Sequence, residues 1–365
     1  MARFIFIQHT LMDNLGPMLL TSFLKSKGHS CKILVDCEEK DFFKKVGEEN
    51  PDFITFSITT GIHQKSIETA ERIKSIYPNV KTLFGGSHAT FFPEMINHDA
   101  VDIVCRGEGE DSILDLANLF DEKKDFNRIE NLWIKQNGQV YKNDVRPLIK
   151  ELDSYPLPDR EYYLRYKIIR DYPSKPIITS RGCPYSCSFC FNHSLKKIYE
   201  GKGKYLRQRS VDHVFAELKE VKDNHPVRSF SFVDDSFLMR PDWVSEFLER
   251  YKEEISTPFF TQIRVNTVTE ELVKKLAWAG CIRISIGLES GNDFIREKIL
   301  KKTIKREEII KATSLFKKHK IKFRTYNMIG SPGETIDNAF ETIELNSLIK
   351  TDYPWASIIQ PYPRT

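Results

Sequence analysis

Long apolar runs are missing from the start of this sequence. After Met1 and a single basic residue, the opening segment holds only the four-residue apolar run 4–7, far short of a signal-peptide core or a membrane span. A dominant charge is missing too, because 55 Lys and Arg residues are nearly balanced by 51 Asp and Glu residues, which gives a net charge of +4. These absences predict a cytoplasmic protein with no membrane span and no nucleic-acid partner.

Cysteine, glycine and proline are also scarce. Seven cysteines, an odd number in a chain without a secretory signal, argue against a disulfide framework. With 17 glycines, 17 prolines and 40% hydrophobic residues, the composition excludes collagen-like, low-complexity and disordered chains. A length of 365 residues is too much for one small core, so we expect a globular protein of two or three domains.

Strand and helix patterns alternate through the first 126 residues. The expected strands are RFIFIQ, CKILVD, FITFSI, VKTLFGG and AVDIVC. This α/β alternation predicts a parallel, doubly wound, Rossmann-like sheet, which binds ligands at the carboxyl ends of its strands. The candidate binding loops are therefore residues 57–61, 85–90 and 107–110.

The pattern changes in residues 127–174. A hairpin with its turn at Asn137 and Gly138 is followed by a proline-rich segment, which we interpret as a linker. Alternation resumes in residues 175–365, which predict a partial (β/α)6, TIM-like barrel with its chemistry at the carboxyl ends of the strands. The six expected strands are PIITS, SFSFVDD, FFTQIRV, IRISIGLE, KFRTYNMIG and WASIIQP.

Three cysteines lie within eight residues, directly after the first of these six strands. Cys183, Cys187 and Cys190 could bind one soft metal centre from a single loop. One candidate is zinc, with His193 as the fourth ligand. The other is a 4Fe-4S cluster with one iron left open. Zinc motifs usually come as two separated pairs of ligands, so the spacing favours the cluster.

The segment CPYSCSFC resembles the C-x3-C-x2-C signature of radical S-adenosylmethionine (SAM) enzymes, which have an aromatic residue, here Phe189, before the last cysteine. Later segments resemble strand-end motifs of the same family, in order: SFVDDSF (231–237), IGLESGND (286–293) and NMIGSPGET (327–335). Three N-terminal segments resemble the cobalamin-binding domain of one large subgroup: PDFITFSITTG, FGGSHATFFPE and VDIVCRGEGED. The resemblance covers nearly the whole chain.

This resemblance implies a set of residues for the cluster and for SAM. The three cysteines would hold the 4Fe-4S cluster, whose open iron binds SAM and cleaves it to a 5′-deoxyadenosyl radical. Arg264 would pair with the SAM carboxylate, or be a surface arginine; Glu289 would accept the ribose hydroxyls, or be an exposed carboxylate. Asp234 and Asp235 would receive the methionine amino group, orient a second substrate, or merely cap a helix. The SAM-binding residues are then Phe189, Asp234, Asp235, Arg264, Glu289, Ser290, Gly330 and Gly333.

For cobalamin, the D-x-H-x-x-G string that supplies a histidine beneath the cobalt does not occur here. The resemblance then implies binding through backbone and small polar side chains. The expected contacts are Ser57, Thr59, Thr60, Gly85, Gly86, Ser87, Gly107, Glu108 and Gly109. His88 is either a cobalt ligand or a loop histidine that caps backbone, and we favour the second. A bulky residue at Gly86 is expected to block the path of the nucleotide tail.

Other features have ordinary interpretations. Lys301, Lys302 and Lys305 predict a solvated helix face. The remaining cysteines lie in or beside apolar stretches, where buried and inert thiols are expected. These are Cys31, Cys37, Cys105 and Cys281.

The leading hypothesis is a cobalamin-dependent methyltransferase that acts on an unactivated carbon of a small molecule. One SAM would methylate cobalamin, a second would give the radical, and a low-potential donor such as flavodoxin or ferredoxin would supply the electron. The alternatives are radical cyclisation or rearrangement without methyl transfer, and a zinc-stabilised binding protein that is not an enzyme. Because the sequence stops after the sixth strand, we expect either a truncated copy or a site that another chain completes.

Overall fold

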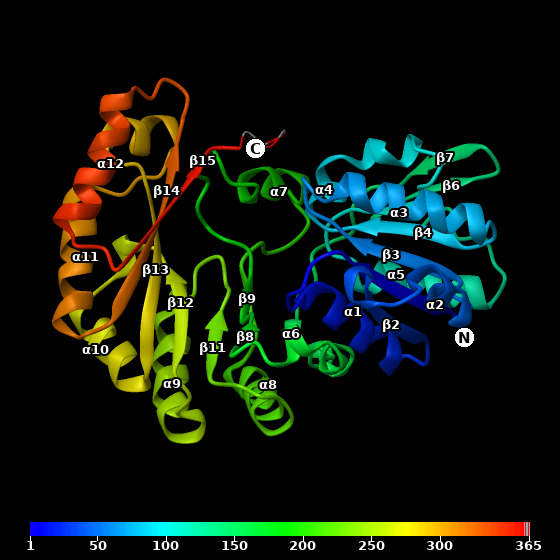
Figure 1. Ribbon diagram of the computed structural model, residues 1–365, viewed down its shortest axis with the longest axis horizontal. Coiled ribbons are helices and arrows are strands. Elements are labelled where there is room, and N and C mark those ends of the chain that lie inside the picture. Colours follow the sequence, from blue (N-terminus) through cyan, green and yellow to red (C-terminus); the bar gives the residue numbers. More distant parts are fainter. Residues whose placement is uncertain (361, 363, 365) are drawn as a thin grey trace. The chain divides into compact units, whose positions relative to one another are not determined.

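The computed structural model in Figure 1 describes residues 1–360, 362 and 364. The chain divides into two compact units. The first holds Met1–Asp171 and Ile198–Lys204, and the second holds Tyr172–Lys197 and the chain from Tyr205 onward.

Within residues 1–171, one sheet has the strand order β2-β1-β3-β4-β5-β6-β7. Its parallel part comprises β1 (Arg3–Gln8), β2 (Ser30–Val35), β3 (Phe53–Ser57), β4 (Lys81–Gly85) and β5 (Ile103–Cys105). Side chains alternate between the faces of a strand, so β1 places Phe4 and Phe6 in one core, and Ile5 and Ile7 in another. Both faces of this sheet are therefore buried, as the continuous apolar runs predict.

Helices cover the two faces of this sheet, which confirms the doubly wound fold (Figure 1). Helices α1 and α5 pack on the core that contains Phe4, whereas α2 and α3 pack on the core that contains Ile5. The helical segments are α1 (Leu15–Ser26), α2 (Phe42–Glu48), α3 (His63–Ile76), α4 (Ser87–Phe91) and α5 (Glu110–Asp121), with 3-10 turns at Asp36–Glu38 and Pro93–Asn97.

The expected hairpin forms from β6 (Leu132–Gln136) and β7 (Gln139–Lys142), with Asn137 and Gly138 in the left-handed backbone region. Here the structure differs from the boundary expected at residue 126. Strand β6 pairs antiparallel with β5, so the hairpin extends the first sheet. The proline-rich segment also belongs to the first unit, because Tyr163 and Tyr166 are buried in the core beneath β1. Its short helical pieces are Leu152–Ser154, Glu161–Arg165 and α6 (Lys167–Arg170).

In the part of the second unit that the structure describes, six parallel strands pair in chain order, which confirms the partial (β/α)6 barrel. They are β8 (Ser174–Ile177), β11 (Ser229–Phe232), β12 (Phe259–Ile263), β13 (Cys281–Glu289), β14 (Lys322–Ile329) and β15 (Tyr353–Ile358). A short antiparallel pair, β9 (Ser180–Arg181) and β10 (Arg207–Gln208), lies beside them.

One face of this second sheet packs against helices. In β11, Phe230 and Phe232 join the apolar core with α8 and α9, whereas Ser229 and Ser231 lie on the opposite face. The helices are α7 (Asn192–Ile198), α8 (Val211–Asn224), α9 (Pro241–Arg250), α10 (Glu270–Ala279), α11 (Arg306–Lys318) and α12 (Ile336–Leu348), with π-helical turns at Tyr251–Ile255 and Ile295–Ile299 and a 3-10 turn at Val265–Thr267. No helix among the described residues is both long enough and apolar enough to cross a membrane.

Candidate active site

The three clustered cysteines share one neighbourhood on the loop between β9 and α7. All three are free and partly exposed. Burial raises the pKa of the Cys183 thiol, and the nearby Asp235, Cys190 and Cys187 raise it further. Burial likewise raises the pKa of Cys190. The three cysteines thus lie on one loop, where their thiolates could bind separate irons of one cluster.

His193, the alternative zinc ligand, is engaged elsewhere. Its Nδ1 lies 2.6 Å from the carbonyl oxygen of Cys190, and its Nε2 lies 3.2 Å from Ser194 Oγ. Among the residues that the structure places, no three His, Cys, Asp or Glu side chains converge on one ion position. The donor set therefore fits a cluster with thiolates on separate irons better than one tetrahedral zinc.

Arg264 follows β12 and lies against the loop between β9 and α7 that contains Cys183, Cys187 and Cys190. This loop is called the cluster loop below. Its guanidinium carbon is 3.8 Å from the centroid of the Tyr185 ring, and its Nη1 is 3.6 Å from Cys187 Sγ. The residue is 8% exposed, so the surface-arginine alternative is wrong. A fixed cation thus stands beside one of the cluster thiols.

The two aspartates after β11 have different surroundings. Asp234 is buried, and its Oδ1 accepts hydrogen bonds from the backbone N–H and hydroxyl of Thr179 and from the hydroxyl of Ser180. Burial raises the pKa of Asp234 to about 6, although these hydrogen bonds lower it. Asp235 is exposed, and its Oδ2 accepts a 3.1 Å hydrogen bond from Asn192, which also donates to Cys190 Sγ. Neither aspartate caps α9, which begins after Arg240, so the helix-cap alternative is wrong.

Glu289, at the end of β13, is buried and forms an ion pair with Lys302. Lys302 Nζ lies 2.6 Å from Glu289 Oε1. Glu289 is therefore not a random exposed carboxylate. The predicted solvated helix face is wrong: residues 301–305 lie between two helical segments, and Lys302 is only 8% exposed, whereas Lys301 and Lys305 are exposed. Ser290 is fully buried, and its hydroxyl accepts a hydrogen bond from the Asn292 N–H.

The two glycines after β14 lie in an open loop. Gly330 and Gly333 both have a positive φ, at 87° and 76°, and a Cβ at Gly333 would meet no atom within 4 Å. The backbone N–H groups of Gly330 and Ser331 donate to Glu334 Oε2. A flat base could approach this loop, although these two N–H groups are already used.

The candidate cobalamin loops of the first unit are brought together at the carboxyl edge of its sheet. The His88 N–H donates to the Ile58 carbonyl, and Thr60 Oγ1 lies 2.9 Å from His88 Nδ1. Thr90 Oγ1 donates to the Gly86 carbonyl and accepts from the Gly107 N–H. Of the other candidates, Ser57, Gly85, Ser87 and Gly109 are partly buried and Thr59 is exposed.

Two of these candidates have internal roles that the sequence did not indicate. Gly86 has φ 91°, and a Cβ there would lie 2.6 Å from the Ile58 carbonyl oxygen, so a bulky residue would collide with the protein's own backbone before any cofactor. Glu108 already forms two hydrogen bonds within the first unit: its Oε2 accepts from the Ile149 N–H, and its backbone N–H donates to the Tyr199 hydroxyl. The expected contact of Glu108 with cobalamin therefore competes with bonds inside the unit.

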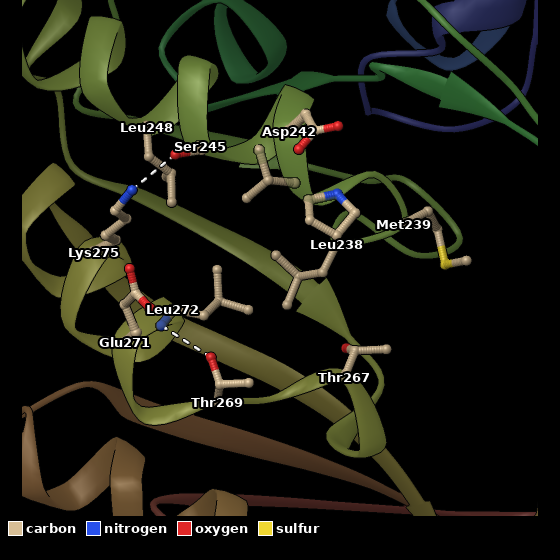
Figure 2. Close-up of a pocket in the computed structure, with 12 residues that line it drawn as sticks. Leu238, Met239, Asp242, Ser245, Leu248, Thr267, Thr269, Glu271, Leu272 and Lys275 are labelled. Carbon is tan, nitrogen blue, oxygen red and sulfur yellow. Dashed lines mark hydrogen bonds between the residues drawn. The ribbon is translucent and has the colours of Figure 1, made fainter.

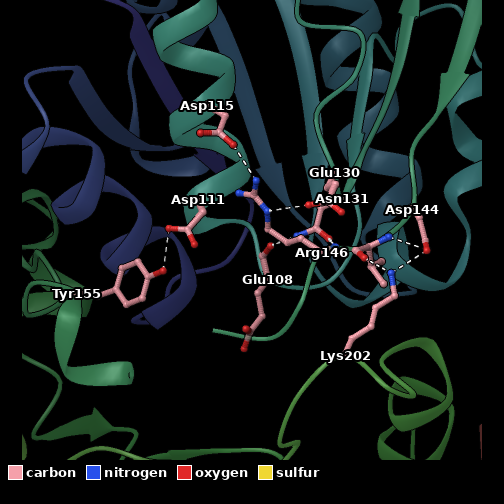
Figure 3. Close-up of polar contacts among 10 residues, drawn as sticks. Glu108, Asp111, Asp115, Glu130, Asn131, Asp144, Arg146, Tyr155 and Lys202 are labelled. Atoms are coloured by element: carbon pink, nitrogen blue, oxygen red, sulfur yellow. Dashed lines mark hydrogen bonds and ion pairs between the residues drawn. The ribbon is translucent and has the colours of Figure 1, made fainter. Parts of the chain in front are cut away.

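The loop that contains Glu108 is part of a polar network (Figure 3). Asn131 donates to the Glu108 carbonyl and accepts from the Arg146 N–H, and Arg146 pairs with Asp115. Lys202 pairs with Asp144 at 2.7 Å. This network fixes the loop after β5 from several sides.

His88 is a packed loop histidine. Its ring stacks on His63 with a centroid separation of 4.0 Å and on Phe92 at 4.9 Å. Burial, followed by the charge of His63, lowers the pKa of His88 to about 4. These contacts agree with the loop role that we favour.

The four other cysteines are buried with one exception. Burial raises the pKa of Cys31, Cys105 and Cys281 to about 12, which makes these thiols unreactive. Cys37 is exposed, so its expected burial is wrong.

A cavity of about 560 Å³ lies between α9 and α10 and does not contain the residues described above (Figure 2). Its lining is largely apolar, with Lys275 donating to Ser245 at one end. The lining residues are Leu238, Met239, Pro241, Asp242, Val244, Ser245, Leu248, Thr267, Thr269, Glu271, Leu272 and Lys275.

Comparisons with known proteins agree with this geometry. Residues 177–345 match the radical SAM superfamily, and residues 9–117 match the B12 binding domain. The chain is also 30% identical over 361 residues to an uncharacterized methyltransferase of Pyrococcus horikoshii, covering 96% of this chain and 77% of that protein. The chain belongs to the radical SAM enzymes that carry a cobalamin-binding domain. The expected enzyme class and the expected cofactors, a 4Fe-4S cluster, SAM and cobalamin, are those of this family.

Other similar proteins are longer than this chain, and their names state different reactions. The anaerobic magnesium-protoporphyrin IX monomethyl ester cyclase of Rubrivivax gelatinosus is 25% identical over 367 residues, and the match spans 93% of this chain but 64% of the cyclase. The structure of the methyltransferase TsrM from Kitasatospora setae superimposes with a TM-score of 0.80 at 16% identity, over 98% of this chain and 73% of TsrM. At that identity the match shows a shared fold.

Proposed function

We propose that the protein transfers a methyl group to an unactivated carbon of a small molecule. The observation that carries this proposal is the relative of 30% identity, which aligns with nearly the whole chain and is named a methyltransferase. When bound, the three cofactors would supply the methyl group and a 5′-deoxyadenosyl radical.

The residues of the second unit have distinct proposed tasks. Cys183, Cys187 and Cys190 hold the cluster, and Arg264 provides the cation for a carboxylate next to it. Glu289 accepts hydroxyl groups at the end of β13. Asp235, the exposed aspartate beside the cluster loop, is better placed than the buried Asp234 to meet an amino group or a second substrate.

The proposed partners follow from the chemistry. Reductive cleavage of a sulfonium consumes one electron at low potential, so we propose a flavodoxin or ferredoxin as donor, in the cytoplasm. In the first unit, we propose that cobalamin uses the strand-end loops around Thr60 and Gly86, which hydrogen bonds hold together.

The test begins with cofactor loading of the full chain under anaerobic conditions. We expect about four irons per chain, release of 5′-deoxyadenosine with reductant and SAM, and cobalamin binding at micromolar concentration. Cys187→Ala should lose the iron, whereas Cys37→Ala, which removes an exposed thiol outside the cluster loop, should keep it. A folded protein that binds no cobalamin would refute methyl transfer, and stoichiometric zinc without colour would refute the cluster.

Ring closure is the second candidate, favoured by the similarity to the Rubrivivax gelatinosus cyclase. The two reactions differ in the fate of the SAM methyl group. With SAM labelled in its methyl carbon, methyl transfer places the label in a product, whereas cyclisation leaves all of it in methionine and unreacted SAM.

A further inference from the structure

Residues 299–303, which begin at the last residue of the π-helical turn Ile295–Ile299, contact the cluster loop directly. The Ser188 N–H donates to the Leu300 carbonyl at 3.0 Å, and the Ser188 hydroxyl donates to the Ile299 carbonyl at 2.7 Å. Ser188 stands between two of the cluster cysteines in the sequence. These two hydrogen bonds therefore fix the middle of the cluster loop to residues 299–303.

The same short segment contacts Glu289 and Arg264. Lys302 forms the buried ion pair with Glu289, and its Nζ lies 6.0 Å from the centroid of the Phe189 ring. Thr303 accepts from Arg264 Nη2 through both its carbonyl and its hydroxyl, each at 3.4 Å. One stretch of five residues thus joins the cluster loop, the carboxylate after β13 and the cation after β12.

Glu289 has an unusual backbone that needs outside support. Its φ is 66°, in the left-handed region, and the pairing of β13 with β14 shifts register between Gly287 and Glu289. A residue other than glycine holds this conformation only where its surroundings fix it. The Lys302 ammonium provides such a contact at Oε1, and within the described residues Oε2 accepts no hydrogen bond.

Gly287 makes room for this ion pair. A Cβ at Gly287 would overlap both Glu289 Oε1 and Lys302 Nζ, so the carboxylate and the ammonium meet directly over its backbone. The pair therefore depends on three positions: Gly287, Glu289 and Lys302.

We infer that Lys302 is a positioning residue, which holds the Glu289 carboxylate in register with the cluster loop and leaves Oε2 free for a hydroxyl group of the cosubstrate. This inference rests on the proposed SAM chemistry. Lys302 would act through Glu289, because its own ammonium is occupied by Oε1.

The test measures SAM affinity, by equilibrium dialysis, on the full chain with its cluster reconstituted. Lys302→Met should weaken SAM binding about tenfold or more, because a buried carboxylate that has lost its cation no longer keeps its position. Lys301→Met is the matched control: it removes the same charge from the neighbouring, exposed residue and should change the affinity less than about twofold.

A double-mutant cycle separates positioning from general damage. If Lys302 acts through Glu289, Lys302→Met should add little to the loss already caused by Glu289→Gln. Full additivity of the two losses would overturn the inference, as would unchanged affinity of Lys302→Met at wild-type iron content.

Gly287→Ala gives a second route that keeps both charges. Its methyl group should displace the Glu289 carboxylate and the Lys302 ammonium from their positions beside residue 287 and so weaken SAM binding, and this variant carries the test if Lys302→Met loses iron. Unchanged affinity of Gly287→Ala would overturn the inference. Failure of the wild-type protein to bind SAM would instead overturn the proposed function.

Discussion

Lowering the pH from 7 to 5 should destabilise the first unit through His88. The folded unit buries this ring between His63 and Phe92 and lowers its pKa to about 4, whereas unfolding returns the pKa to about 6.5. Between these two values the unfolded chain binds more protons than the folded chain. The free energy of unfolding therefore keeps its full value above pH 6.5 and falls as the pH decreases toward 4.

The size of the effect follows from the two pKa values. A fall in the pKa of His88 from 6.5 to about 4 corresponds to a loss of about 2 kcal/mol between pH 7 and pH 5, and of about 3 kcal/mol below pH 4. In His88→Phe, which keeps an aromatic ring in the stack, the loss between pH 7 and pH 5 should be smaller by about 2 kcal/mol. Urea unfolding of both proteins at the two pH values measures this difference.

A direct assay follows the proton on the ring itself. The rate of deuterium exchange at the imidazole C2 carbon, measured by mass spectrometry against pH, gives the pKa of each histidine. For His88 we expect a midpoint of about 4 in the folded protein and of about 6.5 in concentrated urea. A midpoint near 6.5 in the folded protein would refute the buried stack and the argument that follows from it.

Three further changes test the packing around the two sites. Glu217→Gln should lower the free energy of unfolding in urea by about 3 kcal/mol, because it removes the charge that pairs with the buried Arg209; a loss below about 1 kcal/mol would contradict this. Gly291→Ala should lower the free energy of unfolding by about 2 kcal/mol and lower the thermal midpoint, since its Cβ would overlap the Glu341 carbonyl. An unchanged midpoint would contradict this steric argument. Tyr199→Phe should lower the free energy of unfolding by about 1 kcal/mol. It should also speed hydrogen exchange of the Glu108 amide, which donates to the Tyr199 hydroxyl, and unchanged exchange would contradict that bond.

The sequence predicted the parallel strands of both units well, because each is a short apolar run between helical patterns. It failed for the segment after the hairpin. The prolines correctly indicated irregular backbone, but the burial of Tyr163 and Tyr166 depends on strands more than a hundred residues earlier in the chain. No local pattern reports a contact of that range.

Cys183, Cys187 and Cys190 could be identified as candidate cluster ligands because their spacing is local, and this role stays a prediction. The buried ion pair of Lys302 could not be predicted, because Lys302 lies in a basic run that is typical of a solvated helix face. Its partner Glu289 lies where the pairing of β13 with β14 shifts register. The different surroundings of Asp234 and Asp235 could have been anticipated, since adjacent side chains at a strand end point to opposite sides. The hydrogen bonding of Glu108 could not be anticipated, because its partner Tyr199 lies 91 positions later in the sequence.

The return of residues Ile198–Lys204 to the first unit has a consequence for synthesis. These residues supply the Tyr199 hydroxyl and the Lys202 ammonium, so the first unit is complete only 33 residues after Asp171. At about 5 to 20 residues per second, the ribosome needs roughly 2 to 7 seconds for that interval. During it the loop after β5 lacks Tyr199, and Cys183, Cys187 and Cys190 are all added to the chain before Tyr199. A gene fragment that stops at Asp171 would make this interval permanent, so exchanging the first unit between relatives requires moving two separate pieces of sequence.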